Sequence, residues 1–182
     1  MHQVRGVSFG RVAGPAHPAW SAVVSGALSD IAADLTDAGL DATDVEVLLV
    51  LAAAHQSVLD EIDEPRLLHG DLWTVNVMVA IDGDEPRVTG VLDSDRTLWG
   101  DPLADWTVFM IRQRPPADEK AFWAGYGPPP TETAETRLRE FIYRARIQGE
   151  IRLELQRLHR TEAVAHTYPP MAEIVQSLRT YR

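Results

Sequence analysis

The residues best suited to chemistry lie in three neighbouring segments of the chain. The first runs His69-Gly70-Asp71-Leu72-Trp73-Thr74-Val75-Asn76 and has the form H-G-D-x-x-x-x-N between two short apolar runs. A further carboxylate, Asp93, follows 17 residues after Asn76, where another apolar run ends. The third segment is Gly100-Asp101-Pro102-Leu103-Ala104-Asp105. Together they supply two carboxylates and an amide on loops near one another in sequence, followed by an acidic turn.

Phosphoryl transfer is a reaction that needs such a set. A carboxylate must lie beside the acceptor hydroxyl, and oxygen ligands must hold the magnesium that neutralises the nucleotide phosphates. A hairpin between Asn76 and Asp93 would fold the two loop ends back together, so that distant residues could meet around one metal ion. The spacing therefore favours metal-dependent phosphoryl transfer.

In order and spacing these segments resemble the aminoglycoside phosphotransferase family of antibiotic and small-molecule kinases, which has the protein-kinase-like fold. The resemblance implies that Asp71 is the catalytic base, that Asn76 and Asp93 coordinate Mg2+ and so hold ATP, and that His69 and Asp105 support the catalytic loop. It further implies transfer of the ATP γ-phosphate to a small-molecule hydroxyl, and it leaves the identity of that acceptor open.

The sequence departs from the family in the part that would bind the nucleotide. Complete members have an N-terminal lobe with a strand-borne lysine that pairs with the nucleotide phosphates. Here 68 residues precede His69, and the sole lysine is Lys120. We therefore expect a C-terminal lobe with the N-lobe absent and with impaired nucleotide binding. The face that such a lobe would cover should be partly apolar, which predicts self-association.

Three other interpretations compete with a kinase. The chain could be a truncated, non-catalytic lobe that binds a ligand or partner. His69, Asp71, Asp93 and Asp95 could instead form a hydrolytic metal centre of the phosphatase type. Finally, Gly6-Val7-Ser8-Phe9-Gly10 matches the G-x-S-x-G nucleophile elbow of α/β-hydrolases, although that elbow requires a buried strand before the serine and a helix directly after it.

The elements that would position these residues follow the order helices, a small β region, then helices. Apolar spacing predicts helices over 18–35, 45–62, 131–160 and 170–182, and a further helix that begins at Asp101-Pro102 with Asp as N-cap. Short apolar runs predict strands over 66–68, 75–81 and 87–92, with Asp82-Gly83-Asp84 as the turn of a hairpin. We therefore predict a predominantly helical α+β fold in a single domain over residues 1–182. The family resemblance implies that this domain is a protein-kinase-like C-lobe with a small β-hairpin that carries the catalytic and metal-binding loops.

Two sets of side chains outside the motifs have structural interpretations. We expect the aromatic residues that follow the metal motif to be mostly core; these are Trp99, Trp106, Phe109, Phe122, Trp123 and Tyr126. Glutamates are interspersed among the arginines of the long helix over 131–160. We therefore expect surface ion pairs for Arg137, Arg139, Arg144, Arg146, Arg152 and Arg157.

Composition narrows the functional classes. The formal net charge of −10 argues against nucleic acid as a partner and leaves room for a cationic substrate. Cysteine is absent, which excludes disulfides, thiolate metal sites and cysteine nucleophiles. No apolar run approaches the roughly 18 to 20 residues that cross a bilayer, and the first residues lack the apolar stretch of a signal peptide. We therefore expect a cytoplasmic protein with no membrane partner.

Overall fold

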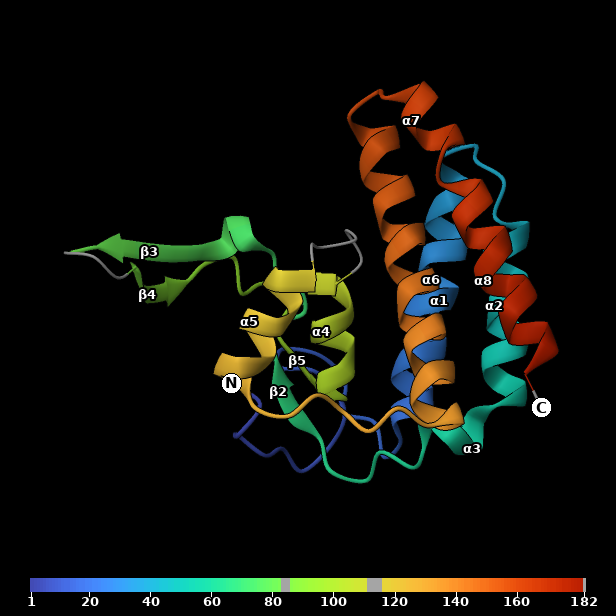
Figure 1. Ribbon diagram of the computed structural model, residues 1–182. Helices are drawn as coiled ribbons and strands as arrows, with labels where there is room; N and C mark the ends of the chain where they lie inside the picture. The colour runs from blue at the N-terminus through green and yellow to red at the C-terminus, as the bar shows by residue number, and fades with distance from the viewer. Residues whose placement is uncertain (83–85, 111–115, 182) are drawn as a thin grey trace. The chain divides into compact units, whose positions relative to one another are not determined.

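The structure is a computed structural model that describes residues 1–82, 86–110 and 116–181, and these residues form two compact units (Figure 1). One unit comprises residues 1–16 and 64–130, and the other comprises residues 17–63 and 131 onward. Helices dominate both the element count and the chain, as predicted for a helical α+β fold. None of the helices in the described ranges is long and apolar enough to span a bilayer.

The all-helical unit is a bundle whose four longest helices pack against one another (Figure 1). Its elements are α1 Trp20–Asp37, α2 Thr43–Ala54, α3 Gln56–Leu59, α6 Ala134–Arg157, α7 Thr161–Ala165 and α8 Tyr168–Thr180. Each long helix buries an apolar stripe, and Leu28, Leu48, Leu138 and Met171 have no exposed surface at all. The helices predicted over 18–35, 131–160 and 170–182 are confirmed, whereas the one over 45–62 is interrupted at His55.

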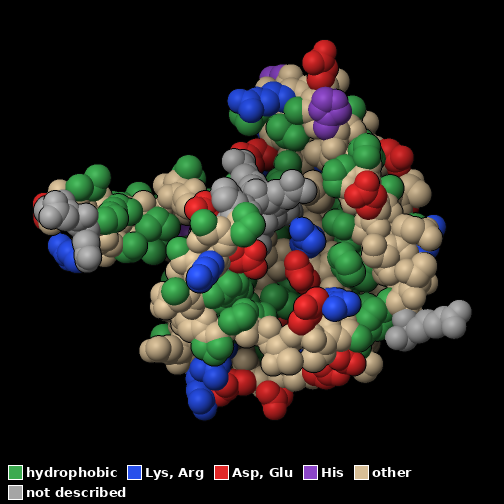
Figure 2. Space-filling view, in the orientation of Figure 1, with side chains coloured by type: hydrophobic (Ala, Val, Ile, Leu, Met, Phe, Trp, Pro, Cys, Tyr) green, Lys and Arg blue, Asp and Glu red, His purple; other side chains and the backbone are tan. Residues whose placement is uncertain are grey.

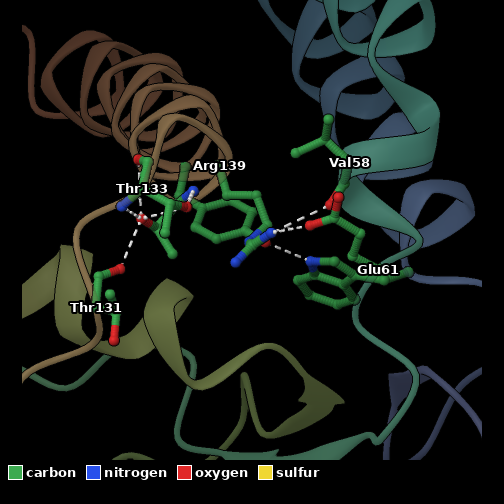
Figure 3. Close-up of polar contacts among 8 residues, drawn as sticks. Val58, Glu61, Thr131, Thr133 and Arg139 are labelled. Atoms are coloured by element: carbon green, nitrogen blue, oxygen red, sulfur yellow. Dashed lines mark hydrogen bonds and ion pairs between the residues drawn. The ribbon is translucent and has the colours of Figure 1, made fainter.

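The start of α6 shows why the sequence begins a helix there. The Thr133 hydroxyl accepts a hydrogen bond from the Thr136 amide at 3.1 Å, and the Thr136 hydroxyl accepts one from the Thr133 amide at 2.7 Å (Figure 3). This reciprocal pair forms a capping box in which threonine replaces the usual Glu or Gln. Two otherwise unpaired amide donors are thereby satisfied.

The expectation that the α6 arginines form surface ion pairs is confirmed for Arg137 and Arg144 and wrong for two others. Arg139 is only 8% exposed and donates to the Val58 carbonyl and to Glu61 (Figure 3). Arg152 is fully buried and meets both oxygens of Asp44, at 2.9 and 2.6 Å. The guanidinium is the cation best suited to such burial, because its planar fork fits a carboxylate in two bonds.

The described residues of the mixed unit form two small sheets and two α-helices. A three-stranded antiparallel sheet has the order β1 Gly10–Arg11, β5 Leu98–Gly100, β2 Arg66–Leu68, and the helices are α4 Pro102–Met110 and α5 Pro116–Tyr126. Strand β2 has the predicted bounds, and the Asp101 carboxylate caps α4 as predicted by accepting the Leu103 amide at 3.0 Å. The two-residue β1 and the three-residue β5 were not predicted.

The second sheet is the predicted hairpin, formed by β3 Val77–Ile81 and β4 Pro86–Val91 after the 3-10 turn Thr74–Asn76. Its register pairs Val77 with Val91 and Ile81 with Pro86, with an irregularity between Met78 and Val79. Gly83 and Asp84 of the predicted turn lie outside the described residues. Hydrophobic side chains are exposed along this hairpin (Figure 2), among them Met78, Val79, Ile81 and Val88.

Candidate active site

The loop over residues 69–76, which we call the catalytic loop, is held at its start by one buried carboxylate. Strand β2 ends at the buried Leu68, and the next two amides both donate to Asp105 of α4. The His69 amide lies 2.7 Å from Oδ2 and the Gly70 amide 2.7 Å from Oδ1. Asp105 is 1% exposed, so these charge-assisted bonds form away from water and fix the direction in which the loop leaves the strand.

His69 ties the catalytic loop to the strand that leads to Asp93. Its Nε2 lies 2.8 Å from the Leu92 carbonyl, and its Nδ1 accepts the Asp71 amide at 3.3 Å. Because a carbonyl only accepts, Nε2 must bear the hydrogen. Both ring nitrogens are therefore occupied, which is a positioning role and leaves no lone pair for a metal.

A hydrolytic centre built on His69 is consequently disfavoured. Within the described part of the chain, no group of three or more His, Cys, Asp or Glu residues is placed to hold a metal ion. The hydrolase elbow also fails, because Ser8 lies in a bend ahead of β1 and the first helix begins only at Trp20.

Gly70 brings the two functional loops into direct contact. Its φ of +82° lies in the left-handed region, and a Cβ at this position would overlap the Arg96 carbonyl oxygen. Only glycine avoids both problems, since it has no side chain and adopts positive φ freely. The glycine of the H-G-D motif therefore sets how closely the segment that contains Asp93 approaches Asp71.

The backbone around Asp71 is fixed from both sides. Its amide donates to His69, and its carbonyl accepts the Trp73 amide and the Asn76 side-chain Nδ2, each at 2.9 Å. The Asp71 carboxylate is half-buried, and no described residue hydrogen-bonds it. A rigid backbone thus presents an acceptor group that remains available to a ligand.

Asp93 follows directly from the hairpin ladder. Beyond the Val77–Val91 pair, the Leu92 amide donates to the Asn76 carbonyl at 2.8 Å, so Asn76 lies opposite Leu92 and Asp93 comes next. Asp93 is exposed and has a φ of +62°, a left-handed conformation that aspartate and asparagine tolerate better than most residues. The hairpin therefore returns the chain to the catalytic loop, as its spacing predicted.

Two residues of this network were not anticipated. The His2 Nε2 lies 2.9 Å from Oδ2 of Asp105, and its Nδ1 lies 2.7 Å from the Tyr126 hydroxyl. No sequence signal could find a contact between positions 103 and 124 residues apart. Tyr126 belongs to an aromatic cluster in which Trp106 and Trp123 pack edge to face at 5.2 Å, and Phe122 stacks on Tyr126.

That cluster is less buried than expected for core aromatic residues. Trp106, Phe122 and Trp123 are half-buried and Tyr126 is 43% exposed, while the Phe109 side chain lies outside the described residues. Partial burial raises the pKa of the Tyr126 hydroxyl, and the nearby Asp105 charge adds to that effect.

Residues 1–141 match the family model described as Phosphotransferase enzyme family. The fold is similar to a thermostable mutant of the aminoglycoside phosphotransferase APH(4)-Ia in its apo form, with a TM-score of 0.63 and 19% identity over 88% of this chain and 53% of that one. No curated protein matches the chain significantly in sequence.

Two further solved structures are described as candidate fructosamine-3-kinases. The one from Haemophilus somnus 129PT has a TM-score of 0.65 and 17% identity over 95% of this chain and 59% of that one. The one from Thermobifida fusca YX-ER1 has a TM-score of 0.60 and 20% identity, over 94% and 61%. The chain therefore spans a little over half the length of the structures it resembles, with the kinase-like fold that they share. On the family match, which covers more than half of its length, the chain belongs to the phosphotransferase enzyme family.

Proposed function

We propose that this chain transfers the γ-phosphate of ATP to the hydroxyl of a small molecule. The observation that carries the proposal is the geometry of the catalytic loop. His69 and Asp105 fix its backbone, and the Asp71 carboxylate has no hydrogen-bond partner among the residues that the structure describes. In this proposal Asp71 is the base, and Asn76 and Asp93 are the ligands of Mg2+. Family membership supports the reaction class.

The residues present fit a magnesium ion. Asn76 directs its Nδ2 to the Asp71 carbonyl, and an amide carries its oxygen on the opposite side, so Oδ1 is turned away from that bond. The exposed Asp93 adds a carboxylate one residue beyond the position opposite Asn76. Hard oxygen ligands of this kind suit Mg2+, which when bound would neutralise the phosphate charge.

The chain's own contribution to the reaction is to place and accept a proton. An acceptor hydroxyl beside Asp71 would donate its hydrogen to a carboxylate oxygen, which aims the oxygen lone pair at the phosphorus and takes up the proton as the new bond forms. The Asp71 backbone makes three hydrogen bonds, so the carboxylate need not reorganise during that step.

Two finer properties belong to the same proposal. The sole lysine, Lys120, lies in helix α5, well after the catalytic loop in sequence. It therefore does not match the strand-borne lysine that pairs with the nucleotide phosphates in complete kinases. We therefore expect weak ATP binding by this chain. One similar structure is a ternary complex with AMP-PNP and hygromycin B, which supports a polar small molecule as the acceptor class.

The test is a transfer assay with γ-labelled ATP and a panel of aminoglycosides and fructosamines, with Asp71→Asn and Asp95→Asn as matched carboxylate variants. The proposal predicts slow, Mg2+-dependent labelling of an acceptor that Asp71→Asn abolishes and Asp95→Asn retains. Phosphate release without labelled acceptor, lost equally in both variants, would instead indicate a hydrolase. An absence of both products at saturating ATP would indicate a non-catalytic binding lobe.

A further inference from the structure

The carboxylate that holds the catalytic loop is shared with a histidine from another part of the sequence. Oδ2 of Asp105, which accepts the His69 amide, also lies 2.9 Å from Nε2 of His2. The side chains of His2 and Asp105 are only 10% and 2% exposed. Three donors therefore converge on one carboxylate that water hardly reaches, where each bond is stronger than it would be at the surface.

The orientation of the His2 ring is determined by its two partners. A carboxylate only accepts, so Nε2 must carry a hydrogen. The other nitrogen, Nδ1, lies 2.7 Å from the Tyr126 hydroxyl, which donates to it when the ring is neutral. Burial raises the pKa of Tyr126, so its hydroxyl keeps its proton near neutral pH. The result is a directional line of hydrogen bonds from Tyr126 through His2 to Asp105.

The backbone of His2 is anchored to the strand that enters the catalytic loop. The His2 carbonyl accepts from Arg66 at 3.3 Å, and the Val4 carbonyl accepts the Leu67 amide at 3.0 Å. The imidazole also packs edge-on against Trp106, with ring centroids 6.0 Å apart. The ring is therefore held between β2 and α4, and its bond to Asp105 does not depend on a freely moving terminus.

We propose that His2 and Tyr126 are positioning residues for the catalytic loop, acting through Asp105. Two backbone amides bind one edge of that carboxylate, and His2 adds the third donor that prevents it from rotating and admitting water. Because the same carboxylate fixes His69 and Gly70, the line of bonds also sets the direction of Asp71. The expected effect of these hydrogen bonds on catalysis rests on the proposed function, whereas their effect on the geometry of the loop does not.

Amide hydrogen exchange on the whole chain tests this without requiring turnover. His2→Leu keeps the bulk and removes the donor, and His2→Gln keeps a side-chain N–H. Tyr126→Phe removes only the hydroxyl. The matched controls are His166→Leu, at an exposed histidine after α7, and Tyr168→Phe, which removes a hydroxyl bond to the Asp41 carbonyl.

In His2→Leu the His69 and Gly70 amides should exchange at least about tenfold faster, while amides of the β2–β5 pairing are unchanged. Tyr126→Phe should give a smaller rise at the same two amides, His2→Gln should restore most of the protection, and the controls should resemble the parent. Parent-like exchange in His2→Leu, or a uniform rise across the unit, would overturn the proposal because bulk or general stability would then be the cause.

A kinetic arm separates this proposal from the proposed function. If the parent transfers phosphate, His2→Leu should lower kcat at nearly constant KM, and His2→Gln should recover it. A parent that shows no transfer together with the expected exchange pattern would overturn the proposed function and support the positioning role. Altered exchange accompanied by an unchanged kcat in an active parent would refute the link between the loop and Asp71.

Discussion

Three carboxylates of one small region, those of Asp71, Asp93 and Asp105, differ in burial and in hydrogen bonding. These differences suit them to different roles. Asp105 is buried and accepts from the backbone amides of His69 and Gly70, so it is structural. Asp71 is half-buried on a backbone that other groups fix, which suits a base. Asp93 is exposed at the end of the hairpin ladder, which suits a ligand for a hydrated cation.

This difference predicts distinct kinetics for two isosteric substitutions, measured in the chain or in a fusion to a related kinase N-lobe. Asp71→Asn should lower kcat by about 10² to 10⁴ at nearly constant KM, because the base acts mainly in the transition state. Asp93→Asn retains a residue that tolerates positive φ, and its activity should partly recover as Mg2+ is raised. Rescue of Asp71→Asn by magnesium to the same extent would rule out this assignment of roles.

Among the helices and strands, the sequence best predicts those that are stabilised by interactions between residues close together in the chain. The cap of α4 and the helices over 18–35 and 131–160 are recognisable because periodicity and capping lie within a few residues. The three-residue β2 is recognisable only as the short apolar run directly before the H-G-D motif. The short β1 and β5 are not, since strands of two or three residues form only by pairing with distant partners. The same reason hides His2, whose role depends on contacts with Asp105 and Tyr126.

The burial of Arg152 could not be predicted from the spacing of charged residues along α6. The interspersed glutamates predict a surface ion pair for Arg152, yet its side chain is fully buried against Asp44, Thr167 and the ring of Tyr168. The partners come from α2, from the α7–α8 connection and from the first residue of α8, which the sequence of α6 does not reveal. Burial of this cation can be inferred only once the bundle is assembled.

That pair predicts a non-additive mutant series. Arg152→Met should destabilise the protein by about 3 to 5 kcal/mol, because Asp44 would be left without its cation partner in a mostly buried position. The double variant with Asp44→Leu should recover much of the loss. Urea unfolding measures both, and a cost below about 1 kcal/mol for Arg152→Met would show that the pair contributes little.

The expected self-association stays a prediction, and the exposed hairpin is one surface on which it can be tested. Val79, Ile81 and Val88 are 49%, 79% and 62% exposed on a two-stranded sheet. Replacing all three by threonine keeps β propensity and charge, and should weaken association by about tenfold or more in sedimentation velocity. The control replaces Val7 and Val50, which are exposed elsewhere. A parent that stays monomeric at all concentrations would refute the expectation.

At the scale of the whole molecule, family membership and the kinase-like fold are established, and the extent of cooperativity is a prediction. The described residues form two compact units, while composition and length favour one domain. We expect a single unfolding transition by calorimetry, with van't Hoff and calorimetric enthalpies equal. Two resolved transitions would mean that the units fold independently.

We expect the catalytic loop and the end of the hairpin to form one cation site beside Asp71. The most direct measurement is localisation of Mn2+, used in place of Mg2+, by paramagnetic broadening of amide NMR signals. A site at these residues should give selective broadening at Asp71, Asn76 and Asp93. The broadening should be lost in Asp93→Gly, in which glycine tolerates the positive φ, and retained in Asp95→Gly. Broadening centred on another part of the chain, or broadening that survives Asp93→Gly, would contradict it.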